Sequence, residues 1–142
     1  TVDDFINMIA ADDLLEWAQV YGNYYGVLKQ QVRDALDAGN HVIIRVDVQG
    51  AKRLSEIIPE ALLIFIIPPS LDVLKMHLEN RGVDSETEMT KRLSAATEEI
   101  NQANLFDFTV TNEEDQLDVT ADSVVAIIES ESQRVPPRNV SF

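Results

Sequence analysis

The chain has 142 residues, of which 45% are hydrophobic and 25% charged, a composition that excludes a disordered or fibrous protein and fits a soluble globular one. Its 11 lysines and arginines face 25 aspartates and glutamates, so the net charge of −14 argues against nucleic acid and anionic membrane surfaces as partners. The absence of cysteine excludes disulfides and cysteine-based zinc sites and fits a reducing compartment.

The first forty residues predict a small lobe that contains an antiparallel pair of strands. An acidic first turn at Asp3-Asp4 favours the start of a helix, and Tyr21-Gly22-Asn23 is typical of a turn between two strands. Gly39-Asn40 predicts a left-handed helix cap. In chain order we expect a helix at 3–9, a strand at 14–20, an extended piece at 24–27 and a helix at 29–38.

The remainder predicts a doubly wound α/β fold. Two apolar runs, 41–46 and 62–67, have the pattern of strands buried on both faces of a parallel sheet, and no apolar run is long enough to span a membrane. Ligands of such folds bind beyond the carboxyl ends of the strands. We expect, in order, a crossover helix at 50–58, a helix at 70–80, a polar segment at 83–90 leading into a helix through 99, a strand at 108–110, a helix at 117–130 and a loose tail at 134–142.

Two carboxylates are candidates for a binding site, and each has an ordinary structural alternative. Asp47 directly follows the run 41–46 and precedes a helix, so it either accepts hydrogen bonds from a purine or a metal-bound water, or caps the helix. Glu16 lies beside Trp17 in an apolar strand. Alternation along the strand favours a solvent-facing Glu16 over one that points into a pocket.

Two arginines flank a polar segment that contains a glycine. Arg81 and Arg92 either close over a polyphosphate and neutralise charge during phosphoryl transfer, or pair with nearby glutamates. The two histidines, His41 and His77, match neither a zinc site nor a catalytic triad, so no metal site is predicted. The phosphate-binding motif G-x-x-x-x-G-K-[ST] does not occur in the 142 residues.

Several short stretches, in this order, match one known family. They are Phe5 with Met8-Ile9, 14–18 (LLEWA), 20–26 (VYGNYYG), 46–51 (VDVQGA), 64–66 with 68–70, 81–86 (RGVDSE), 91–93 and Phe106-Asp107 with Asn112. From residue 1 to about 128 the chain resembles the guanylate kinases, which transfer a phosphoryl group from ATP to GMP.

The resemblance implies an α/β fold of the P-loop nucleoside-monophosphate-kinase type. Such a fold has a parallel sheet with helices on both faces, a small GMP-binding lobe and a lid. The family's first strand, its phosphate loop and a following segment with two arginines that grip GMP have no counterpart in this sequence, and Thr1 matches the position just after that segment. The implied divisions are a GMP-binding lobe at 1–39, a core at 40–133 that includes a lid at 80–100, and a tail at 134–142.

The resemblance also implies roles for individual residues. In this family, carboxylates at two positions bind the guanine N1 and N2 groups, a tyrosine donates to the GMP phosphate, lid arginines act at the transferring phosphates, and further residues contact ATP. In this sequence the guanine-binding pair is Glu16 and Asp47, the tyrosine is Tyr25, the lid arginines are Arg81 and Arg92, and the ATP contacts are Asn112, near the adenine, and His77.

Three positions depart from the family pattern. Val27 stands where the family usually has a hydroxyl that contacts guanine, His77 replaces an ATP-contacting arginine, and Arg45 stands where an acidic or neutral residue is common. Val27 and Arg45, with the sequence at 29–33, resemble the plastid-type guanylate kinases of plants. The expected location is therefore the plastid stroma, with the cytoplasm as the alternative.

Two functions follow from this sequence. The first is a guanylate kinase that uses ATP with Mg²⁺, of which this chain is an incomplete part and inactive alone, because the loop that cradles the phosphates lies outside it. The second is a non-catalytic guanylate kinase-like module that binds protein partners in a larger assembly. Val27, His77 and the lack of the loop favour the module, whereas the five retained GMP-site and lid residues favour the enzyme.

Overall fold

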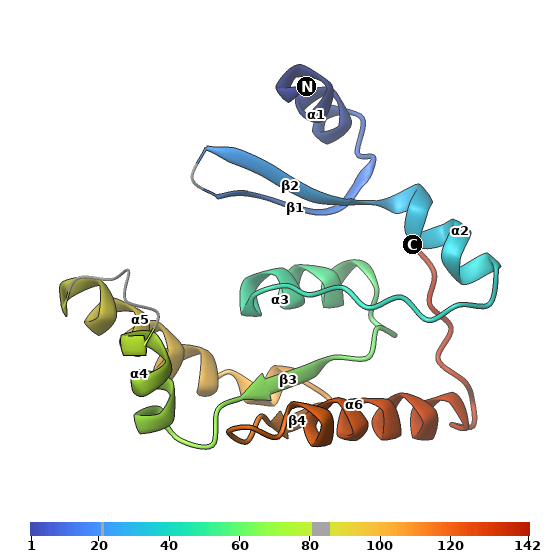
Figure 1. Ribbon diagram of the computed structural model, residues 1–142. Coiled ribbons are helices and arrows are strands. Elements are labelled where there is room, and N and C mark those ends of the chain that lie inside the picture. The colour runs from blue at the N-terminus through green and yellow to red at the C-terminus, as the bar shows by residue number, and fades with distance from the viewer. Residues whose placement is uncertain (21, 81–85) are drawn as a thin grey trace. The chain divides into compact units, whose positions relative to one another are not determined.

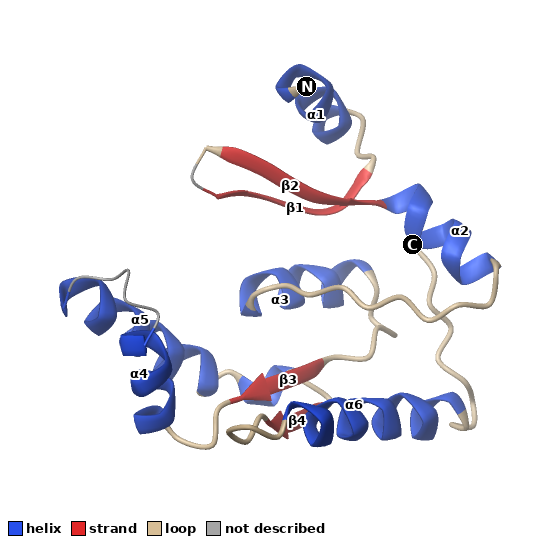
Figure 2. Cartoon of the chain, in the orientation of Figure 1, coloured by secondary structure: helices blue, strands red, loops and turns tan. Residues whose placement is uncertain are grey.

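The computed structural model describes residues 1–20, 22–80 and 86–142, and the chain divides into two compact units, Thr1–Ile57 and Ile58–Phe142 (Figure 1). Helices and strands alternate along both units, which confirms the predicted α/β class (Figure 2). Arg81, one of the two expected lid arginines, lies outside the described residues. The division into lobe, core, lid and tail stays a prediction.

The first unit contains an antiparallel hairpin and three helices. Thr1 caps the first helix: its hydroxyl lies 3.2 Å from the backbone N–H of Asp4, and the hydrogen bond that it donates to the Asp4 carboxylate lowers the pKa of that carboxyl. Gly22, at the turn of the hairpin, has a φ of 81°, which favours glycine. The elements are α1 (Val2–Ala10), β1 (Leu14–Val20), β2 (Asn23–Leu28), α2 (Lys29–Asp37) and α3 (Val48–Ile57).

The register of the hairpin separates its side chains into two faces. Trp17 pairs with Gly26 on one face, where Phe5 of α1 stacks on Tyr24 with ring centroids 5.2 Å apart. The space over Gly26 is filled by the Phe5 ring, so α1 covers this face. Residues of the opposite parity in each strand, including Glu16 and Tyr25, therefore belong to the other face.

Replacing Gly26 with alanine should destabilise the first unit. The added Cβ would lie 2.9 Å from Phe5 Cζ, a distance that real Cβ atoms essentially never show, and 3.1 Å from the Glu16 carbonyl oxygen, which is tighter than most real contacts. We expect Gly26→Ala to lower the free energy of unfolding by about 1–3 kcal/mol, measured by urea denaturation. Adding Phe5→Leu removes the Cζ atom and should restore part of the loss. If it restores nothing, the contact with Phe5 is not the cause.

The run from His41 to Val46 is not a strand in the structure, although its sequence predicts one buried on both faces. Ile43 is 78% exposed. Within the described residues, strand pairing joins only β1 to β2 and the two strands of the second unit. β-branched residues favour a strand only where a neighbouring strand supplies hydrogen bonds and packing, and here none does.

The second unit is built on two parallel strands. Ile64 pairs with Phe108 and Ile67 with Thr111, which confirms that the run at 62–67 contributes to a parallel sheet. The rings of Phe65 and Phe106 stack with centroids 4.6 Å apart. The elements are β3 (Ile64–Ile67), α4 (Leu71–Asn80), α5 (Glu86–Ile100), the short 3₁₀ turn η1 (Ala103–Leu105), β4 (Phe108–Thr111) and α6 (Leu117–Ser132).

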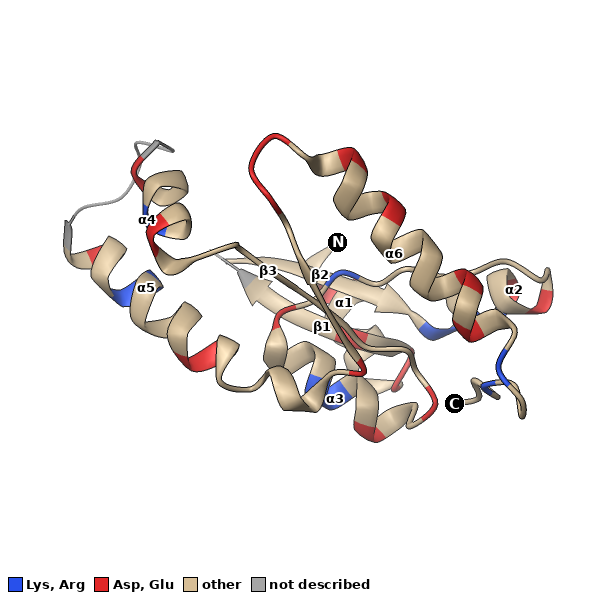
Figure 3. Cartoon of the chain, turned by 90° about the horizontal axis from the view of Figure 1, so that it is seen from below, with Lys and Arg blue, Asp and Glu red and all other residues tan. Residues whose placement is uncertain are grey.

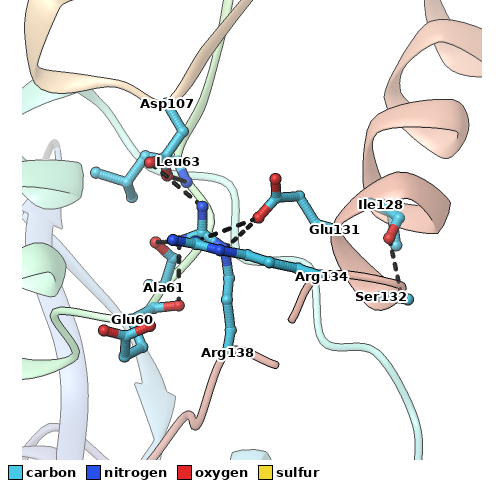
Figure 4. A network of polar contacts seen from close by, with 9 residues as sticks. All are labelled: Glu60, Ala61, Leu63, Asp107, Ile128, Glu131, Ser132, Arg134 and Arg138. Atoms are coloured by element: carbon cyan, nitrogen blue, oxygen red, sulfur yellow. Dashed lines mark hydrogen bonds and ion pairs between the residues drawn. The ribbon is translucent and has the colours of Figure 1, made fainter. Parts of the chain in front are cut away.

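The segment at 134–142 is anchored, which corrects the expectation of a loose tail. The Arg138 side chain is only 14% exposed, and its Nε donates to the Glu131 carboxylate of α6 at 2.6 Å (Figure 4). Its Nη1 lies 3.4 Å and 3.3 Å from the carbonyl oxygens of Glu60 and Ala61, and its Nη2 lies 3.3 Å from Asp107 Oδ1. One guanidinium thus ties the tail to α6 and to the loops before β3 and β4.

Candidate functional site

Glu16 and Tyr25 share the hairpin face that α1 leaves uncovered. Glu16 pairs with Val27, and Ala18 with Tyr25, so the two candidate residues are diagonal neighbours on that face. The Glu16 side chain is 13% exposed, and α3 contacts β1. The solvent-facing interpretation of Glu16 is therefore wrong, because helix packing on this side covers a position that strand alternation alone assigns to water.

Arg53 is a member of this group that the sequence did not single out. Its Nη2 donates to Glu16 Oε1 at 2.8 Å, and its side chain is 49% exposed. The two residues are 37 positions apart, and no motif or spacing connects them. Only the packing of α3 on β1 brings them together.

Asp47 caps the start of α3. Its Oδ1 accepts the backbone N–H of Gly50 at 2.7 Å, which is the helix-cap alternative that the sequence left open. A side chain at position 50 would lie 2.8 Å from Val46 Cβ, so glycine permits this tight approach. The second carboxylate oxygen is compatible with a ligand contact, and the cap holds the side chain in a fixed orientation.

Asn112 of the second unit directly follows β4. Its backbone N–H donates to the carbonyl oxygen of Ile67 at 2.8 Å, which places it at the carboxyl ends of β3 and β4, where α/β sheets bind ligands. The hydroxyl of Thr120, which is 5% exposed, lies 3.0 Å from Asn112 Oδ1. That contact orients the amide so that its nitrogen can donate to an acceptor such as a purine ring nitrogen. Thr120 carried no signal in the sequence.

The other two described candidates also lie in the second unit. His77 is on α4, and its Nε2 is 3.9 Å from Glu114 Oε1, an ion pair only when the imidazole is protonated. Arg92 is on the exposed side of α5. Figure 3 marks basic positions on α3 and α5 within a chain whose acidic residues are spread over most elements. The structure thus groups Glu16, Tyr25 and Asp47 in one unit, and His77, Arg92 and Asn112 in the other.

Within residues 1–20, 22–80 and 86–142, no three histidine, aspartate or glutamate side chains come together as a metal site. None of the helices in these ranges is long and apolar enough to cross a bilayer.

Comparisons with known proteins point to one family. The guanylate kinase family model matches residues 1–131. The chain is 38% identical to the guanylate kinase of Carboxydothermus hydrogenoformans over 97% of its own length, and 41% identical to that of Caldanaerobacter subterraneus over 94%. It is 46% identical to the guanylate kinase of Neisseria meningitidis over 79% of this chain and 55% of that protein.

A solved structure agrees with these sequence matches. The crystal structure of guanylate kinase from Anaplasma phagocytophilum superposes with a TM-score of 0.70 at 28% identity, covering 93% of this chain and 63% of that one. The chain spans 66% and 64% of the Carboxydothermus and Caldanaerobacter relatives. A family model over most of the chain, close relatives and a shared fold lead to one conclusion: the chain belongs to the guanylate kinase family.

Proposed function

We propose that the protein containing this chain is a guanylate kinase, which converts GMP and ATP into GDP and ADP. The observation that carries the proposal is the Glu16 carboxylate, held little exposed on the same hairpin face as Tyr25. Guanine presents N–H donors at N1 and N2, from which carboxylate oxygens can accept hydrogen bonds, whereas adenine presents an acceptor at N1. Glu16, together with Asp47, therefore favours guanine.

The chemistry proposed for these residues is positioning and charge neutralisation. Glu16 and Asp47 accept from the guanine N1–H and N2 amino groups, and the Tyr25 hydroxyl donates to the GMP phosphate. A GMP phosphate oxygen then forms a bond to the γ-phosphorus of ATP, and the bond to the bridging oxygen breaks, so that ADP leaves with the electron pair. Arg92, with Arg81, neutralises charge on the transferring group.

The ATP contacts proposed for the second unit are Asn112, through its amide nitrogen, and His77. Guanylate kinases work with Mg²⁺, which keeps several waters and binds mainly through nucleotide phosphates. The described residues offer this ion no ready cluster of ligands.

A protein-interaction module is the second candidate function. Val27 lacks the hydroxyl that the family usually places near guanine, and His77 stands where the family has an arginine that contacts ATP. A module of this kind would keep the fold and lose nucleotide turnover. Its partners would be proteins in a larger assembly.

Base selectivity decides between the two functions. The measurement is ADP formation by the purified full-length protein with Mg-ATP and either GMP or AMP, alongside calorimetric titration of each nucleotide. We expect kcat/KM for GMP to exceed that for AMP by about 100-fold or more, because the carboxylates meet no donor on adenine N1. If the intact protein shows no turnover and binds no GMP, the interaction module replaces the enzyme as the proposed function.

The proposed location is the plastid stroma, with the cytoplasm as the alternative. It is supported by Val27, Arg45 and the sequence at 29–33, which resemble the plastid-type enzymes. The relatives reported above are bacterial, so they support the family but give no compartment. Cell fractionation would determine where the protein is located.

A further inference from the structure

The contact between Arg53 and Glu16 joins α3 to the hairpin. Arg53 Nη2 lies 2.8 Å from Glu16 Oε1, and the carboxylate side chain is 13% exposed. A carboxylate with so little access to water loses hydration, and a charge-assisted hydrogen bond both compensates that loss and fixes the orientation of the group. Glu16 is thus held by Arg53 before any ligand arrives.

One oxygen of the Glu16 carboxylate remains for a ligand beside this ion pair. Arg53 contacts Oε1, while Oε2 has lone pairs of its own for a second donor. A donor group of the base can therefore bind at Oε2 without displacing the guanidinium. Asp47, the other proposed guanine acceptor, directly precedes α3, the helix that carries Arg53.

We propose that Arg53 is a positioning residue for guanine: it holds the Glu16 carboxylate oriented so that Oε2 accepts from the base. Arg53 acts through Glu16 and does not touch the nucleotide. The inference rests on the proposed function, because it requires Glu16 to bind GMP. Because the base is remote from the transferring phosphoryl group, loss of Arg53 weakens GMP binding equally in the ground and transition states.

The test compares the intact protein with three variants by calorimetric GMP titration and steady-state kinetics. For Arg53→Ala we expect the Kd and KM for GMP to rise about tenfold, with kcat and the KM for ATP within about twofold of the unaltered protein. Arg53→Lys keeps a cation and should recover part of the GMP affinity. Lys52→Ala removes a charge from the neighbouring exposed position on α3 and should leave the GMP affinity unchanged.

Each contrary outcome has a separate meaning. An unchanged GMP affinity in Arg53→Ala would overturn the positioning role, and a tighter one would mean that Arg53 competes with the base. An equal loss for ATP and for GMP, with a lower unfolding temperature, would assign Arg53 to stability alone and also overturn it. If the unaltered protein binds no GMP, the proposed function itself fails and this inference fails with it.

Discussion

Glu16→Gln should reduce kcat/KM for GMP by about 100- to 10,000-fold, because hydrogen bonds to a charged group contribute roughly 1.5–3 kcal/mol each and the bonds of Glu16 to the base and to Arg53 are both at stake. The substitution keeps the size of the side chain but places an amide N–H₂ where one carboxylate oxygen stood. This N–H₂ donor faces the N–H donors of guanine, so no hydrogen bond forms between them. The substitution also removes the charge that pairs with Arg53 at 2.8 Å. The measurement is initial rate against GMP concentration at saturating ATP.

A matched control separates base recognition from general charge loss. Glu56→Gln removes one carboxylate from the exposed side of α3, and we expect kcat/KM for GMP to stay within about twofold. A Glu16→Gln protein that turns over GMP at the normal rate would show that the guanine contact is assigned to the wrong residue. A lowered unfolding temperature in either variant would show that its loss of kcat/KM comes from impaired folding and not from base recognition.

Arg138→Met should lower the free energy of unfolding by about 1–3 kcal/mol and release the tail. Methionine keeps the apolar stem but leaves the carboxylates of Glu131 and Asp107 without their shared cation (Figure 4). Glu131 is 19% exposed, so its charge is poorly compensated by water. The measurements are urea denaturation and hydrogen exchange of the backbone amides at 134–142, which should exchange faster in the variant.

The pKa of Arg138 decides how this contribution depends on pH. Burial lowers the pKa and is the largest single influence, but the hydrogen bonds and ion pairs with Glu131 and Asp107 together outweigh it and raise the pKa above its ordinary value. A pKa raised on folding gives stability that is complete below the unfolded pKa and lost as the pH rises through the folded one. The difference between Arg138→Met and the unaltered protein should therefore hold throughout the neutral range.

Arg134 supplies the control for this second prediction. Its Nη1 lies 3.6 Å from Glu131, and its side chain is 48% exposed. Exposed ion pairs contribute little, so Arg134→Met should change the free energy of unfolding by less than about 0.5 kcal/mol. If Arg134→Met and Arg138→Met lower the free energy of unfolding equally, the stabilisation comes from positive charge in the tail and not from the multiple contacts of Arg138.

The sequence predicted the local elements well, because periodicity and turn residues are local properties. The hairpin turn at Gly22 is present, and strands lie within the predicted segment 62–67 and over 108–110. The run at 41–46 was predicted wrongly, because its composition favours a strand whose hydrogen bonds must come from elsewhere. A strand prediction from local sequence therefore fails where no neighbouring strand pairs with the segment.

The roles assigned to the candidate residues stay predictions, and the contacts around those residues could be predicted only in part. Glu16 was identified, yet its low exposure and its ion pair depend on the packing of α3, which neither alternation nor spacing encodes. Arg53 and Thr120 were missed for the same reason, since each acts on a candidate residue from another element. A single sequence does not reveal such supporting contacts, because they depend on how elements pack.

The two oxygens of Asp47 place a limit on redesign of base preference. One oxygen already holds the first turn of α3 through the Gly50 amide. A replacement chosen only for a new base, such as lysine, would also uncap the helix that carries Arg53. Asparagine is the substitution that retains an oxygen for the cap while turning a donor outward, and a donor suits the N1 acceptor of adenine. Selectivity at this position can thus change only in ways that the helix tolerates.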